Sequence, residues 1–130
     1  MPRLPLLLAL LLPWAVQAAS LKDYELSRDL EKIAAQSSQG TPRAINEDIL
    51  DQGYTAQGIE LINHLGVRAG HAAQMRLHPD TVREQLRSSV CGNPGFSRLL
   101  ERGAILRYEF TELDSKTPVT RERFSSEDCR

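Results

Sequence analysis

The two cysteines of the chain, Cys91 and Cys129, bound the segment that most constrains its fold. Between them the residue pattern predicts a short helix and then a β-hairpin with strands over residues 104–111 and 118–125. In an exported chain two cysteines most simply form a disulfide, and closing a loop of this length stabilises a fold by roughly 4 kcal/mol. A reactive thiol or a metal pair is the alternative, but CxxC spacing and companion ligands are missing from the sequence. We therefore expect a hairpin unit closed by a Cys91–Cys129 disulfide.

The N-terminus carries the export signal that such a disulfide requires. An apolar run over residues 4–12 follows a single basic residue, and small residues at Val16 and Ala18 stand in cleavage-site spacing. This predicts a signal peptide over residues 1–18 and a single mature domain over residues 19–130, in a secreted or periplasmic protein. A membrane anchor is the alternative, but the apolar run is shorter than the roughly 20 residues that a bilayer span needs.

The charge of the chain argues against two classes of partner. Its 16 basic and 17 acidic residues give a formal net charge of −1. Neither the basic footprint of a nucleic-acid-binding protein nor a polybasic membrane patch is visible in the sequence. We expect no nucleic acid partner and no stable membrane anchor.

The part of the mature chain before Cys91 alternates helical and strand-like patterns. The first pattern predicts a helix that Ser20 caps and Gly40 ends. Two strands follow between Pro42 and Val67, joined near residues 55–58, and then a loop over residues 68–74. A second helix begins near Pro79 and carries an apolar stripe of Val82, Leu86 and Val90. An apolar helix stripe most often covers a sheet. The element order therefore predicts an α+β fold, in which an antiparallel sheet of about four strands has helices packed mainly on one face and one disulfide closes the chain.

Three arginines of the predicted hairpin are candidates for a binding surface. Arg107 lies on the polar face of the first strand, and Arg121 and Arg123 lie on the second strand. Arg121 and Arg123 can pair with Glu109 across the strands, at about 0.2 to 1 kcal/mol each. A solvated charged face is one interpretation, and an anion-binding surface made by the three arginines is the other.

Glu60, Asn63 and His64 are candidates for lining a cleft between the sheet and the helices. They lie on a strand whose alternation is imperfect, because Asn63 occupies a position in phase with the apolar residues. A strand covered partly on both sides is typical of such a pattern. With this cleft, the chain would be a small enzyme or a ligand carrier.

No other pattern in the sequence predicts a metal, a cofactor or a reaction. His64, His71 and His78 recur at equal spacing, which would align them on one face of a continuous helix, but two intervening glycines argue against such a helix. The chain has no nucleophile elbow, no HExxH motif, no phosphate loop and no dinucleotide fingerprint. We therefore expect no metal and no cofactor, and we name no catalytic residue.

A likeness to a known family rests on five segments of the mature chain, which are Gly40–Asp48, Gly53–Tyr54, Glu60–Leu65, Ser89–Cys91 and Arg107–Phe110. In these segments the chain resembles a family of short secreted bacterial proteins, the putative quorum-sensing-regulated virulence factors. The resemblance implies a compact α+β fold, with helices packed on an antiparallel sheet, and export from a Gram-negative cell. The family has no established reaction, so no catalytic residue carries over, and protein–protein interaction is the activity that the resemblance implies.

The resemblance and the lack of a catalytic motif favour a non-enzymatic, exported protein-binding module, associated with virulence and regulated by quorum sensing. Its partner is an unknown protein, and a homodimer through an exposed sheet edge or an uncovered sheet face is a further possibility. The alternative is the small enzyme or ligand carrier described above. A periplasmic assembly accessory is a third hypothesis, which differs from the first mainly in where the protein ends up.

Overall fold

The computed structural model describes the backbone of residues 14–130 and the side chains of residues 21–130. The predicted signal peptide over residues 1–18 therefore lies largely outside the described residues, and cleavage after Ala18 stays a prediction. Residues 14–18 form the first part of a helix.

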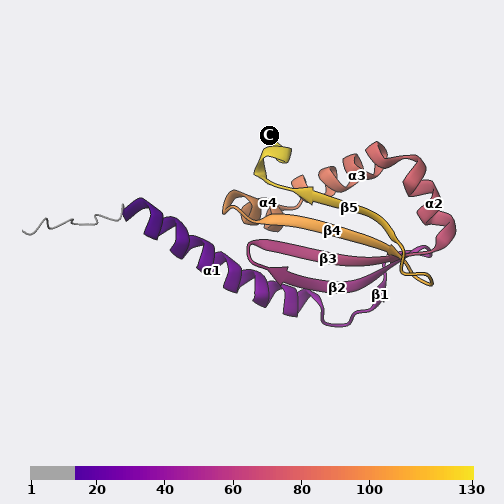
Figure 1. Cartoon of the computed structure of the whole chain (residues 1–130), viewed down its shortest axis with the longest axis horizontal. Helices are drawn as coiled ribbons and strands as arrows, with labels where there is room; N and C mark the ends of the chain where they lie inside the picture. The colour runs from indigo at the N-terminus through magenta and orange to yellow at the C-terminus, as the bar shows by residue number, and fades with distance from the viewer. Residues whose placement is uncertain (1–13) are drawn as a thin grey trace, which may run out of the picture.

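The described chain contains four α-helices, a five-stranded sheet and a short 3₁₀ helix near the C-terminus (Figure 1). In chain order the elements are α1 (Trp14–Ser37), β1 (Arg43–Ala44), β2 (Ile49–Gln57), β3 (Glu60–Val67), α2 (Ala69–Leu77), α3 (Pro79–Cys91), α4 (Pro94–Glu101), β4 (Ile105–Glu112), β5 (Pro118–Phe124) and η1 (Ser126–Cys129).

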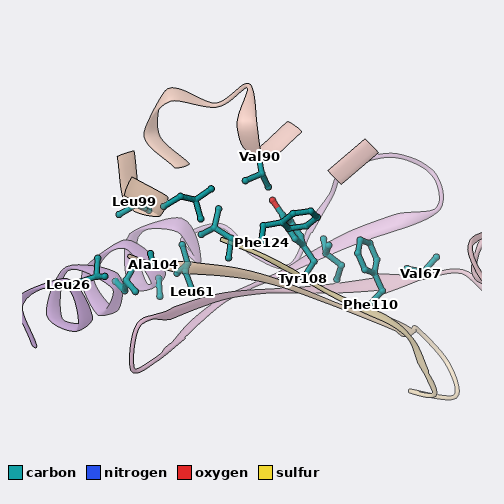
Figure 2. Packing of buried hydrophobic residues seen from close by; sticks show 14 of the residues in the cluster. Leu26, Leu61, Val67, Val90, Leu99, Ala104, Tyr108, Phe110 and Phe124 are labelled. Atoms are coloured by element: carbon teal, nitrogen blue, oxygen red, sulfur yellow. The ribbon is translucent and has the colours of Figure 1, made fainter. Parts of the chain in front are cut away.

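All four helices share one hydrophobic core with one face of the sheet (Figure 2). The core joins Leu26 and Leu30 of α1 to residues of the other helices and to the apolar positions of β3, β4 and β5. Phe124 of β5 lies at its centre and has no exposed surface. The predicted α+β class, with helices packed on one face of the sheet, is confirmed.

The sheet is mainly antiparallel, with one parallel pair at its centre. The strand order is β1-β2-β3-β4-β5, and every neighbouring pair is antiparallel except β3 and β4. Helices α2, α3 and α4 lie between β3 and β4 in the chain and carry it back to the end of the sheet where β3 begins, so the two strands run in the same direction. The short strand β1 adds a fifth member at the edge of β2.

The central strand β3 is buried on both faces, which explains its imperfect alternation. Leu61 and Ile62 point to opposite faces and are only 2% and 3% exposed. The buried Asn63 donates from Nδ2 to Asp51 Oδ1 at 3.0 Å and to the Gly53 carbonyl at 3.2 Å. Asp51 Oδ1 also accepts from the Gly53 N–H at 2.9 Å, where β2 has an irregular register. This buried polar cluster fastens β2 to β3.

The predicted loop over residues 68–74 is wrong, because helix α2 begins at Ala69. Gly70 lies in the first turn of α2, where the backbone N–H groups have no partner inside the helix. A glycine at this position therefore destabilises the helix only slightly. Ala72 and Met75 then face the core at helical spacing. Burial of these two side chains outweighs the low helix propensity of the glycine.

The predicted cap at Ser20 is also wrong, because α1 begins at Trp14 and Ser20 lies inside it. The residues between them, Ala15 to Ala19, include three alanines, and alanine has the highest helix propensity. The helix therefore extends upstream of Ser20.

The C-terminal hairpin and the disulfide are confirmed. Strands β4 and β5 pair antiparallel, and Cys91 at the end of α3 bonds to Cys129 of η1, with a Cα–Cα distance of 5.4 Å. A capping box between Ser125 and Asp128 begins η1. The chain end is thus tied covalently to α3, which begins at Pro79 as predicted.

Candidate functional site

The sheet face opposite the four described helices carries the charged residues that were predicted to form a binding surface. We call it the open face, and its charged ladder consists of Glu60, Arg107, Glu109, Arg121 and Arg123. The nitrogen–oxygen distances along the ladder are 2.9 Å for Arg123–Glu60, 3.5 Å for Arg107–Glu60, 3.0 Å for Arg107–Glu109 and 2.8 Å for Arg121–Glu109. Each of the three arginines therefore already has a carboxylate neighbour.

Of the two pairs predicted with Glu109, the one with Arg121 is confirmed and the one with Arg123 is wrong. The hairpin register places Arg123 opposite Arg107, and Arg123 reaches Glu60 on β3 instead. Like charges directly opposite one another are unfavourable, so a carboxylate from the next strand offsets the Arg107–Arg123 contact.

Arg107 is the most enclosed of the three arginines. Its side chain is 16% exposed, against 61% for Arg121 and 54% for Arg123. The Arg107 Nε is close to the Glu109 carboxylate but is not aligned to donate a hydrogen bond to it. A bound anion would have to displace glutamates from this ladder, so the geometry favours the ion-paired face, and anion binding stays a prediction.

Glu60, Asn63 and His64 do not line one cleft, because strand alternation separates them. Glu60 and His64 lie on the open face, whereas Asn63 points to the helix side and bonds to Asp51. His64 Nε2 lies 2.8 Å from Thr55 Oγ1 on the neighbouring strand. The helix-side groove described below is lined by none of the three.

The equally spaced histidines lie on three different elements. His64 is in β3, His71 is in α2, and His78 caps the N-terminus of α3. Across the described residues, no group of three or more His, Cys, Asp or Glu side chains is placed to hold a metal ion.

A groove of about 290 Å³ opens between helices α2 and α3 and the edge of the core. We call it the α2–α3 groove. Its floor is apolar and consists of Ile49, Met75, Val82, Leu86 and Phe110. Met75 and Phe110 belong to the buried core, and the other three side chains are half-buried. The groove therefore exposes one margin of the core to a ligand.

The rim of the α2–α3 groove is polar and consists of His71, Gln74, His78, Thr81 and Gln85. The Nδ1 of His71 lies 3.8 Å from Asp48 Oδ2. Among the described residues no Asp, Glu, Lys or Arg lines the groove, although such residues make up 25% of the chain. A second hollow of about 390 Å³ lies beside the disulfide, but its walls are mainly polar.

Sequence reasoning missed this groove. The sequence predicts that the stripe with Val82 and Leu86 covers the sheet, and it predicts a loop over residues 68–74. It therefore does not predict helix α2, which forms one side of the groove. In the structure only Val90 of that stripe is fully buried. The sequence pattern does not distinguish a stripe residue that is buried from one that is left half-exposed.

Two tyrosines of the described chain, the buried Tyr108 and the half-buried Tyr54, have clearly raised pKa values. Burial raises the pKa of Tyr108 to about 12, with the nearby Tyr54 adding to the effect. Burial, together with the Asp51 carboxylate, also raises the pKa of Tyr54. The raised pKa means that both hydroxyls stay protonated to a higher pH than an exposed tyrosine would.

Alkaline pH is expected to destabilise the fold through Tyr108. Its pKa rises from 10.0 to about 12 on folding, so between these values the folded state keeps a proton that the unfolded chain releases. This contribution, on the order of 2 kcal/mol, is complete below the unfolded pKa and is lost as the pH rises through the folded one. Urea denaturation across this range should show a smaller loss for Tyr108→Phe than for the wild type. Equal losses would contradict the assignment to Tyr108.

A family model described as "Putative quorum-sensing-regulated virulence factor" matches residues 19–130. The matched range coincides with the mature domain predicted from the sequence. A comparison with curated proteins found no match.

Three solved structures are similar to this chain. A crystal structure of a putative secreted protein from Pseudomonas aeruginosa is 64% identical, covers 85% of this chain and 97% of its own, and has a TM-score of 0.82. A type 2 secretion system pilotin from Vibrio vulnificus is 14% identical, with 85% and 97% covered and a TM-score of 0.70. A type II secretion system pilotin from Vibrio cholerae is 16% identical, with 86% and 99% covered and a TM-score of 0.67. The likeness to the two pilotins shows the fold alone.

Within the described residues, no helix combines the length and the apolar character that crossing a membrane requires.

Proposed function

The chain belongs to the family of putative quorum-sensing-regulated virulence factors, and on that premise we propose that it is an exported, non-enzymatic module that binds a partner protein through the α2–α3 groove. The similar protein from Pseudomonas aeruginosa is described as a putative secreted protein, which supports export of this chain. The observation that carries the proposal is the apolar floor of the groove, which is left open inside a polar rim.

The openness of the groove favours a protein over a small molecule. Val82 and Leu86 are half-buried, and Gln74, Thr81 and Gln85 on the rim are exposed. Small-molecule sites usually enclose most of their ligand, whereas protein interfaces combine an apolar centre with a polar rim. An apolar side chain offered by a larger surface would complete the burial of this floor.

The charge of the groove narrows the chemistry of the partner. Because no Lys or Arg of the described residues lines the groove, it offers no permanent counter-charge to a phosphate or a carboxylate, and because no Asp or Glu lines it, it offers none to a basic segment. The amides of Gln74 and Gln85 can both donate and accept hydrogen bonds. The partner segment therefore presents apolar side chains and an uncharged contact face.

The ionisable groups support a non-enzymatic role. Enzymes usually gather groups with perturbed pKa values in one pocket. The two tyrosines with raised pKa values, Tyr54 and Tyr108, do not line the groove. Among exposed groups, a hydrogen bond from Arg87 lowers the pKa of Glu84, and neither residue lines the groove.

The periplasmic assembly accessory considered from the sequence has only an analogy of fold in its favour. Two type 2 secretion system pilotins share this fold at 14% and 16% identity, and this likeness points to no particular partner. The link to quorum sensing and virulence comes from the family description and concerns the setting in which such a protein acts.

Site-specific photo-crosslinking tests the proposal in cells that export the chain. The probe is a photoreactive amino acid placed at Gln85 on the groove rim, or, as a control, at the exposed Ser88, which lies on the opposite side of the same helix from Leu86. We expect a discrete protein adduct from position 85 and none from position 88, because Gln85 lines the groove and Ser88 does not.

A matched pair of variants then tests the groove itself. Leu86→Glu places a charge on the apolar floor and is expected to abolish the adduct, whereas Ser88→Glu adds the same charge on the exposed side of α3 and should leave the adduct intact. Adducts that form equally from both positions, that survive Leu86→Glu, or that are absent would contradict a protein partner in this groove. Absence of an adduct would favour the ligand carrier.

A further inference from the structure

Strand β5 is the long free edge of the described sheet. It lies at one end of the strand order, while the other end is the two-residue strand β1 (Figure 1). An edge strand presents unpaired N–H and C=O groups that can template pairing with another chain. The exposed groups of β5 therefore decide whether this sheet can be extended.

The register shows which backbone groups of β5 point outward. Ile105 donates its N–H to the carbonyl of Ile59, on the β3 side of β4, so alternate residues of β4, including Arg107 and Glu109, also point that way. Their partners on β5, Arg123 and Arg121, consequently direct their backbone groups away from β4. These groups form the free edge.

Two arginines from the helices cap this edge at its ends. Arg76 of α2 donates from Nη2 to the Pro118 carbonyl at 3.1 Å, and Arg83 of α3 donates from Nη1 to the Arg123 carbonyl at 3.2 Å. Pro118 itself has no N–H to offer a partner. At each end of the edge a backbone carbonyl is therefore already hydrogen-bonded, and at Pro118 the backbone N–H donor is missing as well.

Each capping arginine is anchored by its own contacts. Arg76 Nη2 lies 3.4 Å from Glu112 Oε2. Arg83 lies 2.9 Å from Glu122 and 3.1 Å from Asp128, with its guanidinium 4.6 Å from the Phe124 ring centroid. These contacts position the two guanidinium groups where an added strand would have to lie.

We propose that Arg76 and Arg83 are edge guards that prevent β5 from pairing with the β5 strand of a second copy of this chain. A two-fold pair of edge strands is the simplest way in which a single sequence extends its own sheet. Such a pair would have to displace the arginines from both carbonyls. The edge-paired homodimer considered from the sequence is thereby suppressed, and the groove is left as the surface for a partner.

The test compares the wild type with an Arg76→Ala/Arg83→Ala double variant and with Arg87→Ala. Arg87 lies on α3 one turn beyond Arg83 and bonds to Glu84, so it is a matched control for losing an arginine from that helix. The probe is a synthetic peptide of residues 118–124, titrated in excess while backbone amide NMR shifts and sedimentation are followed. We expect the double variant alone to bind the peptide, and a second copy of itself, at least tenfold more tightly than the wild type does. The backbone amide shifts of Arg121 and Arg123 should change on binding.

Adding Arg121→Pro to the double variant separates edge pairing from partial unfolding. Because the Arg121 N–H points away from β4, the proline removes an outward donor without breaking the β4–β5 ladder, and it should abolish both kinds of association. A folded double variant that stays monomeric and ignores the peptide would overturn the proposal. So would a wild type that associates equally, or association that persists with the proline.

Discussion

Replacing both Cys91 and Cys129 by serine is expected to lower the free energy of unfolding by about 4 kcal/mol. The disulfide spans 38 residues and joins the end of α3 to η1, so its loss frees a long loop in the unfolded chain. For a domain of this length the same loss corresponds to a fall in Tm of about 15 to 20 °C. Urea denaturation and calorimetry of the purified domain measure both quantities.

Reduction of the wild type provides the control for this prediction. It should reproduce the fall in stability seen in the serine variant, and it should leave the serine variant itself unchanged. A loss below about 1 kcal/mol would mean that the other contacts of η1 hold the chain end without the bond, and it would contradict the entropic argument.

Phe124→Ala is expected to cost about 3 to 5 kcal/mol of unfolding free energy, because it removes a large side chain with no exposed surface. The ring packs edge-on against Tyr108 (Figure 2), with centroids 6.2 Å apart. It also lies beneath the Arg83 guanidinium. The cavity would loosen β5 from α3 as well as from the sheet. Denaturation in urea gives the size of the loss.

Phe124→Leu is the matched control, since it keeps most of the buried apolar volume. We expect it to cost about 1 kcal/mol, well below the cost of alanine. Equal losses for leucine and alanine would show that the aromatic ring itself, rather than the filled volume, supports this site. A loss below about 1 kcal/mol for alanine would mean that the core collapses into the cavity.

The elements with a strong local pattern were predictable from the sequence. In the C-terminal hairpin, Leu106, Tyr108 and Phe110 alternate with polar residues and are buried in the structure. Helix α3 follows from the proline at position 79 and its apolar stripe, and it begins there. The disulfide followed from the cysteine count in a chain expected to be exported. Each of these depends on a short stretch of sequence.

Features that depend on distant contacts were not predictable in the same way. The parallel pairing of β3 with β4 arises from the path of three helices, which no local pattern records. The sequence predicts a loop with Gly70 where the structure has helix α2. The burial of Met75 stabilises this helix, and that burial depends on the rest of the fold. The residue pattern of one helix or strand does not show which other element packs against it.

The candidate site was predictable only in part. The sequence placed Arg107, Arg121 and Arg123 on one face, and the structure brings them together, but it also adds Glu60 from β3, which neutralises part of their charge. The α2–α3 groove needs Ile49 of β2 and Met75 of α2 at the same place, and these residues are far apart in the chain. Its prediction required the tertiary structure.

The central claim is that a partner protein binds in the α2–α3 groove, and the affinity of one peptide tests it most directly. The peptide is the partner segment that crosslinks to position 85, and its binding to the purified domain is measured by calorimetry. We expect Leu86→Glu to weaken binding at least tenfold, about 1.4 kcal/mol, and Ser88→Glu to leave it unchanged. Equal affinities for the wild type and Leu86→Glu would contradict the claim.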